Sequence, residues 1–322
     1  TIGADIGPNV TSVTQASTTS SLVLSGNNGY TGDTIISAGT LRLGAADVIP
    51  DGAGKGNVSV SGVLDLNGFS ETINGLSGGG LVDNTAASSN AVLTLSTGSI
   101  FSGTIQNSGA PLTLVKGPDG DVVLTGNNNT YSGDTIVQGG RLFIANAGAL
   151  TPNGSVQVNA GSLVINAAGS PTFAQTINLA SGAAPSMRKD ATISGVILPT
   201  AGSLVFNRDD QPTVAFSLNS APVLAGDLTV QVGGGTNSTF GDVTLAGVIT
   251  GTGGLTKTQT GTLILAGVNS YSGDTVVGGG VLAVNGTSIA NSGKLVIAGG
   301  KVELTNTETV RTLFFGGVQQ AA

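Results

Sequence analysis

The sequence contains no cysteine and no histidine among its 322 residues. Without cysteine, the protein can form no disulfide bond and has no thiol chemistry, so other interactions must stabilise its fold. Without histidine, it lacks the side chain that most often serves as a general base or as a metal ligand. Both absences weigh against catalysis, and they favour a fold held together by ladders of hydrogen-bonded strands.

Charge is also scarce, because charged residues make up only 9% of the chain, with a net charge of −7 and an isoelectric point near 4.3. Binding to nucleic acid requires clustered Lys and Arg, and the 11 basic residues here are dispersed. We therefore expect no nucleic-acid partner. No apolar run approaches the roughly 18 residues that span a bilayer, so we also expect no membrane insertion by this segment.

Glycine, in contrast, is abundant, with 53 residues. The glycines follow no three-residue period, which excludes a collagen triple helix. The mean hydropathy of +0.30 indicates enough Val, Ile and Leu to bury, so we expect a folded chain.

One phrase occurs three times and contains all three tyrosines of the protein. In every copy the tyrosine is followed by Thr or Ser, then Gly, Asp and Thr, and a further glycine stands five positions after that last Thr. This fixed spacing predicts a repeated structural unit whose copies bury their apolar faces against their neighbours. The repeated corner residues are Tyr30, Gly32 and Asp33; Tyr131, Gly133 and Asp134; and Tyr271, Gly273 and Asp274.

The repeat also sets the expected domain organisation. We place the repeat units near residues 22–80, 112–166 and 255–316, inside a continuous β-solenoid over 21–322. Residues 1–20 are expected to form an N-terminal arm or an edge strand. The stretch near 167–250 is irregular and contains prolines, which are excluded from central ladders and so mark corners or excursions.

Short strands are predicted throughout, for example at 34–36, 40–43 and 58–60. Each is bounded by Gly, Asn, Asp or Ser, the residues that form turns, and no window has the period of a helix. Pairs of strands are separated by a single Gly, as expected where a chain turns a corner within one coil, whereas sandwich strands are more widely spaced. The sequence therefore predicts an all-β parallel β-helix, a β-solenoid that forms a single elongated rod.

Two segments carry a resemblance to a known family: Lys257-Thr-Gln-Thr-Gly-Thr-Leu-Ile-Leu-Ala-Gly and Asn269-Ser-Tyr-Ser-Gly-Asp-Thr-Val-Val. With their counterparts in the other copies, they resemble the autotransporter-associated β-strand repeat, also called the passenger-associated transport repeat. The resemblance implies a right-handed parallel β-helix in a bacterial secreted or surface protein. Many such proteins are adhesins or components of the biofilm matrix, so an extracellular or cell-surface location is expected.

The candidate site residues have structural and chemical interpretations. We expect each repeat Asp to form an Asx turn at its corner and each tyrosine to pack over that corner, although the tyrosines could also form a carbohydrate-stacking surface. Asp119 and Asp121 are the candidate calcium ligands. The third repeat has no acid at the equivalent positions, so we expect neither a metal nor a cofactor.

The function expected from these features is structural and adhesive, with end-to-end self-association into surface or matrix filaments. Surface polysaccharide and host or neighbouring cells are the other expected partners. Two alternatives remain open: a glycan-binding module that uses the tyrosines, and a polysaccharide-acting enzyme that uses Arg208, Asp209 and Asp210. Because adjacent residues of a strand point to opposite faces, these two acids would not share a substrate, and we expect no enzyme.

Overall fold

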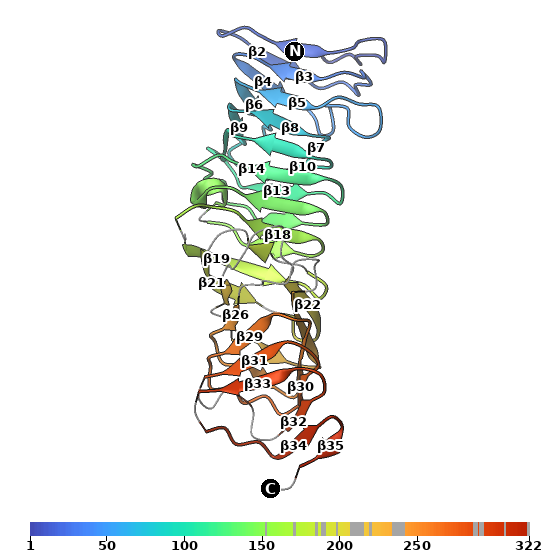
Figure 1. The fold of residues 1–322 in the computed structure, drawn as a ribbon. Coiled ribbons are helices and arrows are strands. Elements are labelled where there is room, and N and C mark those ends of the chain that lie inside the picture. The colour runs from blue at the N-terminus through green and yellow to red at the C-terminus, as the bar shows by residue number, and fades with distance from the viewer. Residues whose placement is uncertain are drawn as a thin grey trace. The chain divides into compact units, whose positions relative to one another are not determined.

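The structure is a computed structural model of the whole chain, and it divides into two compact units, Thr1–Val156 and Gln157–Ala322. We describe each unit by itself (Figure 1). The residues that the structure describes are 1–151, 153–169, 172–183, 186–187, 191–197, 199–206, 216–218, 221–233, 242–285, 289, 293–305 and 307–320.

Unit 1 is a stack of coils whose strands form three parallel sheets. The strands of the first sheet are β1 (Val13–Gln15), β3 (Thr34–Ile36), β5 (Val58–Val60), β8 (Leu76–Gly78), β11 (Ser99–Phe101), β14 (Asp121–Leu124) and β16 (Arg141–Ile144). Those of the second are β7 (Glu71–Ile73), β10 (Ala91–Leu95), β13 (Leu112–Lys116) and β15 (Thr135–Val137). Those of the third are β2 (Ser21–Leu24), β4 (Thr40–Leu43), β6 (Val63–Asp65), β9 (Leu81–Asp83) and β12 (Thr104–Ile105). A single turn of 3₁₀ helix, η1 (Ala147–Ala149), interrupts the loop before β17 (Val156–Val158).

Unit 2 repeats this arrangement with parallel strands. One sheet contains β19 (Thr172–Leu179), β21 (Ala191–Ile197), β23 (Phe216–Leu218), β26 (Val243–Leu245), β29 (Thr262–Leu265), β31 (Val281–Val284) and β33 (Lys301–Leu304). Another contains β22 (Gly202–Phe206), β25 (Leu228–Val232), β28 (Leu255–Thr258), β30 (Thr275–Val277), β32 (Lys294–Ile297), β34 (Thr312–Phe315) and β35 (Val318–Gln319). The remaining strands pair as β18 (Ser162–Ile165) with β20 (Ser186–Met187), and as β24 (Val223–Leu224) with β27 (Thr250–Gly251). The β34–β35 hairpin is antiparallel.

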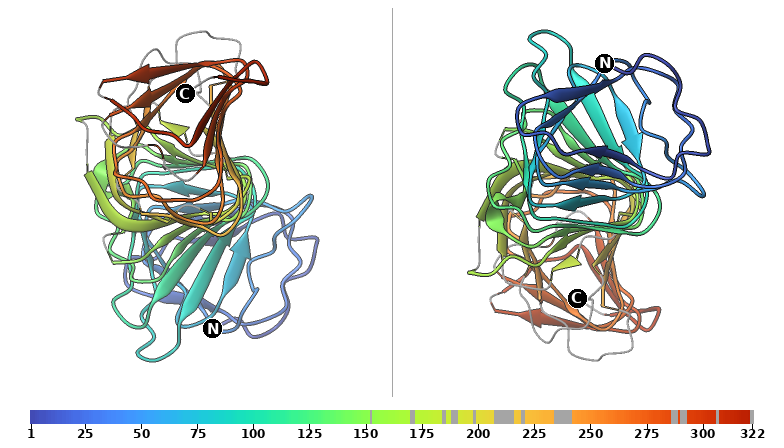
Figure 2. Two further views of the ribbon diagram at one scale, coloured as in Figure 1. Left: turned by 90° about the horizontal axis from the view of Figure 1, so that it is seen from below. Right: turned by 90° about the horizontal axis from the view of Figure 1, so that it is seen from above.

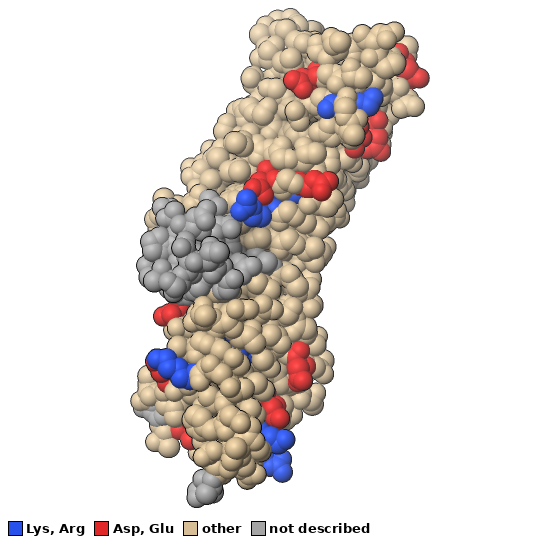
Figure 3. All heavy atoms as spheres, turned by 45° about the vertical axis from the view of Figure 1, so that its right-hand side comes forward, with Lys and Arg blue, Asp and Glu red and all other residues tan. Residues whose placement is uncertain are grey.

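Within a sheet, each residue pairs with the residue at the same place in the next coil, so like side chains stack in columns. Leu41 pairs with Leu64, and Leu64 with Val82, which in turn pairs with Ile105. All four side chains are fully buried, and Figure 2 looks along this stack of coils. The outward positions of the same strands form two further columns, one of Thr40, Val63, Leu81 and Thr104 and one of Arg42, Asp65 and Asp83. On the face drawn in Figure 3, the charged side chains lie in a few separate groups.

The prediction of an all-β parallel β-helix is therefore confirmed. Strands 34–36, 40–43 and 58–60 have the predicted bounds. The stretch 167–250 contains β19 to β26 together with undescribed residues, among them Pro171, Pro185 and Pro212. A single solenoid that continues through 21–322 stays a prediction, as do the other domain bounds. None of the described helices is long and apolar enough to cross a membrane.

Close stacking of the coils explains the glycine after each repeat strand. Gly140 has a φ of 55°, and a Cβ there would lie 2.3 Å from the carbonyl oxygen of Gly120 in the preceding coil. A left-handed φ favours glycine, and the short distance leaves no room for a methyl group. Gly39 and Gly280 have the same two properties, so the position needs glycine in all three copies.

We predict that Gly140→Ala destabilises the protein by about 3 kcal/mol, because the strained φ and the backbone clash add together. Gly52→Ala is the matched control, since Gly52 has a φ of 86° and nothing lies within 4 Å of its Cβ position. Strain alone should cost the control about 1 kcal/mol. Equal losses of unfolding free energy in urea for the two variants would contradict the role assigned to the close stacking.

Candidate functional site

Each repeat places its tyrosine in the interior, at the end of the loop that precedes a strand. The exposed fractions of Tyr30, Tyr131 and Tyr271 are 1%, 0% and 0%. In all three copies the phenol oxygen lies 2.6 Å from the Oγ1 of the Thr four residues later. Burial raises the pKa of Tyr131 to about 12, so the hydroxyl stays protonated. The buried rings cannot stack on a carbohydrate, which removes the residues on which the glycan-binding alternative depended.

The asparagine two positions before the tyrosine ties adjacent coils together. Asn129 Oδ1 accepts a hydrogen bond from the N–H of Ile105 at 2.8 Å, and its Nδ2 donates to the carbonyl of Ala149 at 2.7 Å. These partners belong to the preceding and the following coil. Asn28 bonds Ile6 and Val48 in the same way, and Asn269 accepts from Ile249. One side-chain amide thus pairs backbone groups of two other coils.

The repeat aspartates also act between coils. Asp33 Oδ1 accepts from the N–H of Asn57 at 2.9 Å, and Asp274 Oδ1 accepts from the N–H of Lys294 at 3.0 Å. Asp134 Oδ1 accepts from both the N–H and the Oγ of Ser155. Each carboxylate therefore holds the start of a strand in the following coil, whereas the sequence predicted an Asx turn within one corner.

The repeat glycines before these aspartates allow the coils to approach each other. A Cβ on Gly133 would lie 2.3 Å from the carbonyl oxygen of Leu112, and one on Gly273 would lie 2.3 Å from the amide nitrogen of Gly254. A Cβ on Gly32 would lie even closer to the carbonyl oxygen of Thr11. The corner residues therefore serve coil stacking as a group.

In the second and third copies, a buried lysine lies near the end of the strand that pairs with the strand after the corner, β13 in the second copy and β28 in the third. Lys257 Nζ donates to the carbonyls of Thr258, Gln259 and Gly279 at 2.7, 2.8 and 3.2 Å. Lys116 Nζ binds three equivalent carbonyls, those of Gly117, Asp119 and Gly139. Burial lowers the pKa of both amines, that of Lys257 to about 8. We define this arrangement as the carbonyl cradle.

The first copy fills the cradle with Gln15 in place of lysine. Gln15 Nε2 donates to the carbonyls of Ser20 at 2.6 Å and of Ser17 at 3.3 Å. The pairing of Val13 with Thr34 matches that of Leu114 with Thr135, so the first copy begins at β1. Sequence reasoning missed Gln15 because its short side chain and its polar surroundings gave no sign of the shared register.

A buried carboxyl group holds the long loop 44–57 in unit 1. Both oxygens of Glu71 accept backbone hydrogen bonds, from the N–H groups of Val48 and Ile49, each at 3.0 Å. The side chain is 1% exposed, and burial raises its pKa to about 8. In unit 2, Glu308 Oε1 accepts from the N–H of Ile289 at 2.7 Å, which is a similar contact. The sequence shows the shared Glu-Thr pair but not the loop that it holds.

The other candidates from the sequence do not come together as a reactive site. Asp121 pairs with Arg141 at 2.6 Å, and Asp119 is exposed, with its carbonyl in the cradle of Lys116. In the described part of the chain, no group of three or more acidic side chains is placed to hold a metal ion. Arg208, Asp209 and Asp210 lie outside the described residues.

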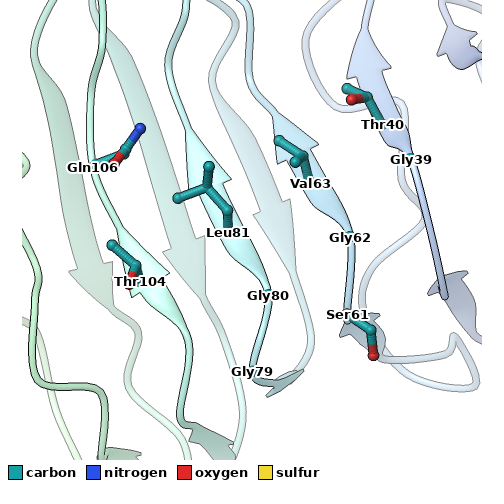
Figure 4. Close-up of a pocket in the computed structure, with 10 residues that line it drawn as sticks. All are labelled: Gly39, Thr40, Ser61, Gly62, Val63, Gly79, Gly80, Leu81, Thr104 and Gln106. Atoms are coloured by element: carbon teal, nitrogen blue, oxygen red, sulfur yellow. The ribbon is translucent and has the colours of Figure 1, made fainter. Parts of the chain in front are cut away.

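A shallow groove crosses the outer face of the third sheet of unit 1 (Figure 4). It has a volume of about 510 Å³. Its lining consists of glycine backbone, neutral polar side chains and two aliphatic side chains: Gly39, Thr40, Ser61, Gly62, Val63, Gly79, Gly80, Leu81, Thr104 and Gln106. In contrast to the repeat corners, this surface presents side chains to solvent.

We predict that Lys257→Met destabilises the protein by about 3 kcal/mol, because it leaves three buried carbonyls without their donor. Lys257→Gln copies the residue found in the first repeat and keeps N–H donors, so its cost should be nearer 1 kcal/mol. Urea unfolding followed by circular dichroism measures both. Equal costs would show that the cradle does not depend on hydrogen-bond donors.

We also predict a pH dependence that arises from Glu71. The folded protein keeps the carboxyl protonated up to pH about 8, whereas the ordinary pKa is 4.5. The contribution of Glu71 to the free energy of unfolding is therefore complete below pH 4.5, and it declines as the pH rises from 4.5 through about 8. The urea midpoint should fall between pH 5 and pH 8, a window in which the chain has no histidine to titrate.

Glu71→Gln should flatten this decline, and Glu303→Gln, at an exposed position, should leave it in place. An unchanged slope in Glu71→Gln would contradict the assignment.

Comparison with known proteins agrees with the repeat that the structure reveals. The family model described as passenger-associated-transport-repeat matches residues 19–43, 114–142 and 255–284. A curated relative, "Adhesin BmaC autotransporter" of Brucella suis biovar 1 (strain 1330), is 34% identical over 152 residues. That alignment covers 46% of this chain and 4% of the relative, so the chain spans only a small part of the relative's length. No solved structure matches the chain. The resemblance to passenger-associated transport repeat proteins is thus confirmed, because the chain carries three copies of that repeat, each built into stacked coils of a parallel β-helix.

Proposed function

We propose that this chain is a structural and adhesive segment of a bacterial protein that is secreted or displayed at the cell surface. The observation that carries the proposal is the threefold repeat, which matches a passenger-associated family model and forms coils of a β-helix. The similarity to part of a protein named an adhesin autotransporter supports both the surface location and the adhesive role.

A structural role, rather than an enzymatic one, fits the way in which the repeat uses its polar groups. Its buried Asn, Tyr and Lys side chains bond to other groups of the protein, as described above, and are not presented to a substrate. The rows of neutral outward side chains form a surface of low charge. Such a surface suits contact with other neutral surfaces, because little charge has to be desolvated.

We further propose that copies of this chain associate end to end into fibres. Terminal coils of a solenoid present unpaired backbone groups, which invite pairing with another chain unless something covers them. A head-to-tail contact that does not close propagates into a filament.

Fluorescent beads coated with the purified chain test the adhesive role. They should bind cultured epithelial cells or a bacterial biofilm in greater numbers than beads coated with an unrelated protein of similar net charge. Equal binding of the two bead types to both surfaces would refute adhesion by this segment. Negative-stain images test the self-association: fibres of the purified chain would support it, and isolated particles at high concentration would contradict it.

A further inference from the structure

The groove on the third sheet of unit 1 is built from one outward column of side chains. Thr40 pairs with Val63, Val63 with Leu81, and Leu81 with Thr104, so the four stand side by side on β4, β6, β9 and β12 (Figure 4). All four are half-buried. The column runs across the strands and therefore along the direction in which the coils stack. A ligand that follows it must be extended, and it would meet two aliphatic side chains between two hydroxyls.

The glycines at the start of these strands make the groove shallow and open. Their carbonyl oxygens are already bonded within the sheet: Val63 N–H donates to Gly39, Leu81 N–H to Gly62, and Thr104 N–H to Gly80, at 2.9 to 3.0 Å. The floor therefore offers no unpaired backbone edge to which a peptide strand could add. Recognition at this surface has to come from the side chains.

The side chains of the groove are uncharged and offer hydrogen bonds. In the described part of the chain, the hydroxyls of Thr40, Ser61 and Thr104 have no hydrogen-bond partner within the protein. Gln106 donates to Asp83 at 2.8 Å, which fixes its carboxamide at the edge of the groove. None of the ten lining residues is charged, and the chain carries a net charge of −7, which disfavours an acidic ligand.

We propose that this groove binds an extended neutral oligosaccharide, a site that deepens the proposed adhesive function and rests on it. A sugar chain presents C–H faces, which would pack on Val63 and Leu81, and equatorial hydroxyls, which would bond to Thr40, Ser61, Thr104 and Gln106. No aromatic ring lines the groove, so each sugar unit gains little and several coils must be engaged together. Affinity for a single oligosaccharide is accordingly modest, and display of many copies on one surface would raise it.

Isothermal titration calorimetry on the purified chain tests the site with cellohexaose and mannohexaose, two extended β-1,4-linked chains, as neutral probes and hexagalacturonate as the acidic probe. At least one neutral probe should bind with a Kd of about 1 mM, and the acidic probe should bind at least tenfold more weakly. Val63→Arg with Leu81→Arg fills the groove with charge and should weaken the binding of the neutral probe at least tenfold. Ile100→Arg is the matched control, because Ile100 is an outward residue of β11 in the same unit, 66% exposed and outside the groove, and it should bind as the unaltered chain does.

Thr104→Val with Ser61→Ala offers a second test that adds no charge, and it should weaken binding at least threefold; circular dichroism checks the fold of each variant. Failure of both neutral probes to bind, or equal binding by the groove variants and the Ile100→Arg control, would overturn the proposal. The adhesive function is judged separately: coated beads that still adhere when neither probe binds would leave adhesion standing and reject this groove. Beads that do not adhere, with probe binding intact, would reject adhesion and leave the groove as a sugar site.

Discussion

The structure depends on hydrogen bonds to the backbone N–H and C=O groups of the loops, which are not paired within the β-ladders. Each coil has loops whose N–H and C=O groups lie inside the stack, and a buried group without a partner costs about 1–3 kcal/mol. The repeat supplies those partners from neighbouring coils, as when Asn129 bonds Ile105 on one side and Ala149 on the other. In the third copy, Lys257 also pairs loop backbone of two coils, because its amine donates to the carbonyl of Thr258 in its own coil and to that of Gly279 in the next. Stacking of apolar columns and pairing of loop backbone therefore support each other.

The buried residues of the repeat differ in role from the outward residues of the sheets. The Tyr, Asn and Lys of the repeat are buried, and their bonds fix the spacing and register of the coils. Some outward residues also pair loop backbone, as Asp83 does by accepting a hydrogen bond from the N–H of Ser108, whereas the residues of the groove column do not. In unit 1, outward residues of the third sheet form the neutral groove, and the first sheet presents the exposed Ile100. Mutations of the groove residues are therefore expected to leave the hydrogen bonds of the repeat intact.

The sequence was sufficient for the fold but not for the contacts between coils. Alternation in segments such as 34–36 and the single-glycine corners predicted the strands, because both signals are local. The bond from Glu71 to Val48, by contrast, joins residues 23 positions apart, and the length of the loop between them decides whether they meet. Gln15 was hidden for a similar reason, since its equivalence to Lys116 appears only when Val13 is seen to pair with Thr34. The groove could not be predicted either, because it requires the register of four coils at once.

Native-state hydrogen exchange, read residue by residue by NMR, tests most directly the claim that side chains of the repeat pair the loop backbone of neighbouring coils. The amides of Ile105 and Ile249 bond to asparagine side chains, and that of Leu114 bonds to the carbonyl of Asp134 in the strand ladder. If this claim holds, all three amides exchange at similarly slow rates, which are set by opening of the coil stack. Exchange of Ile105 and Ile249 as fast as that of the exposed loop residue Asn128, with Leu114 still protected, would contradict it.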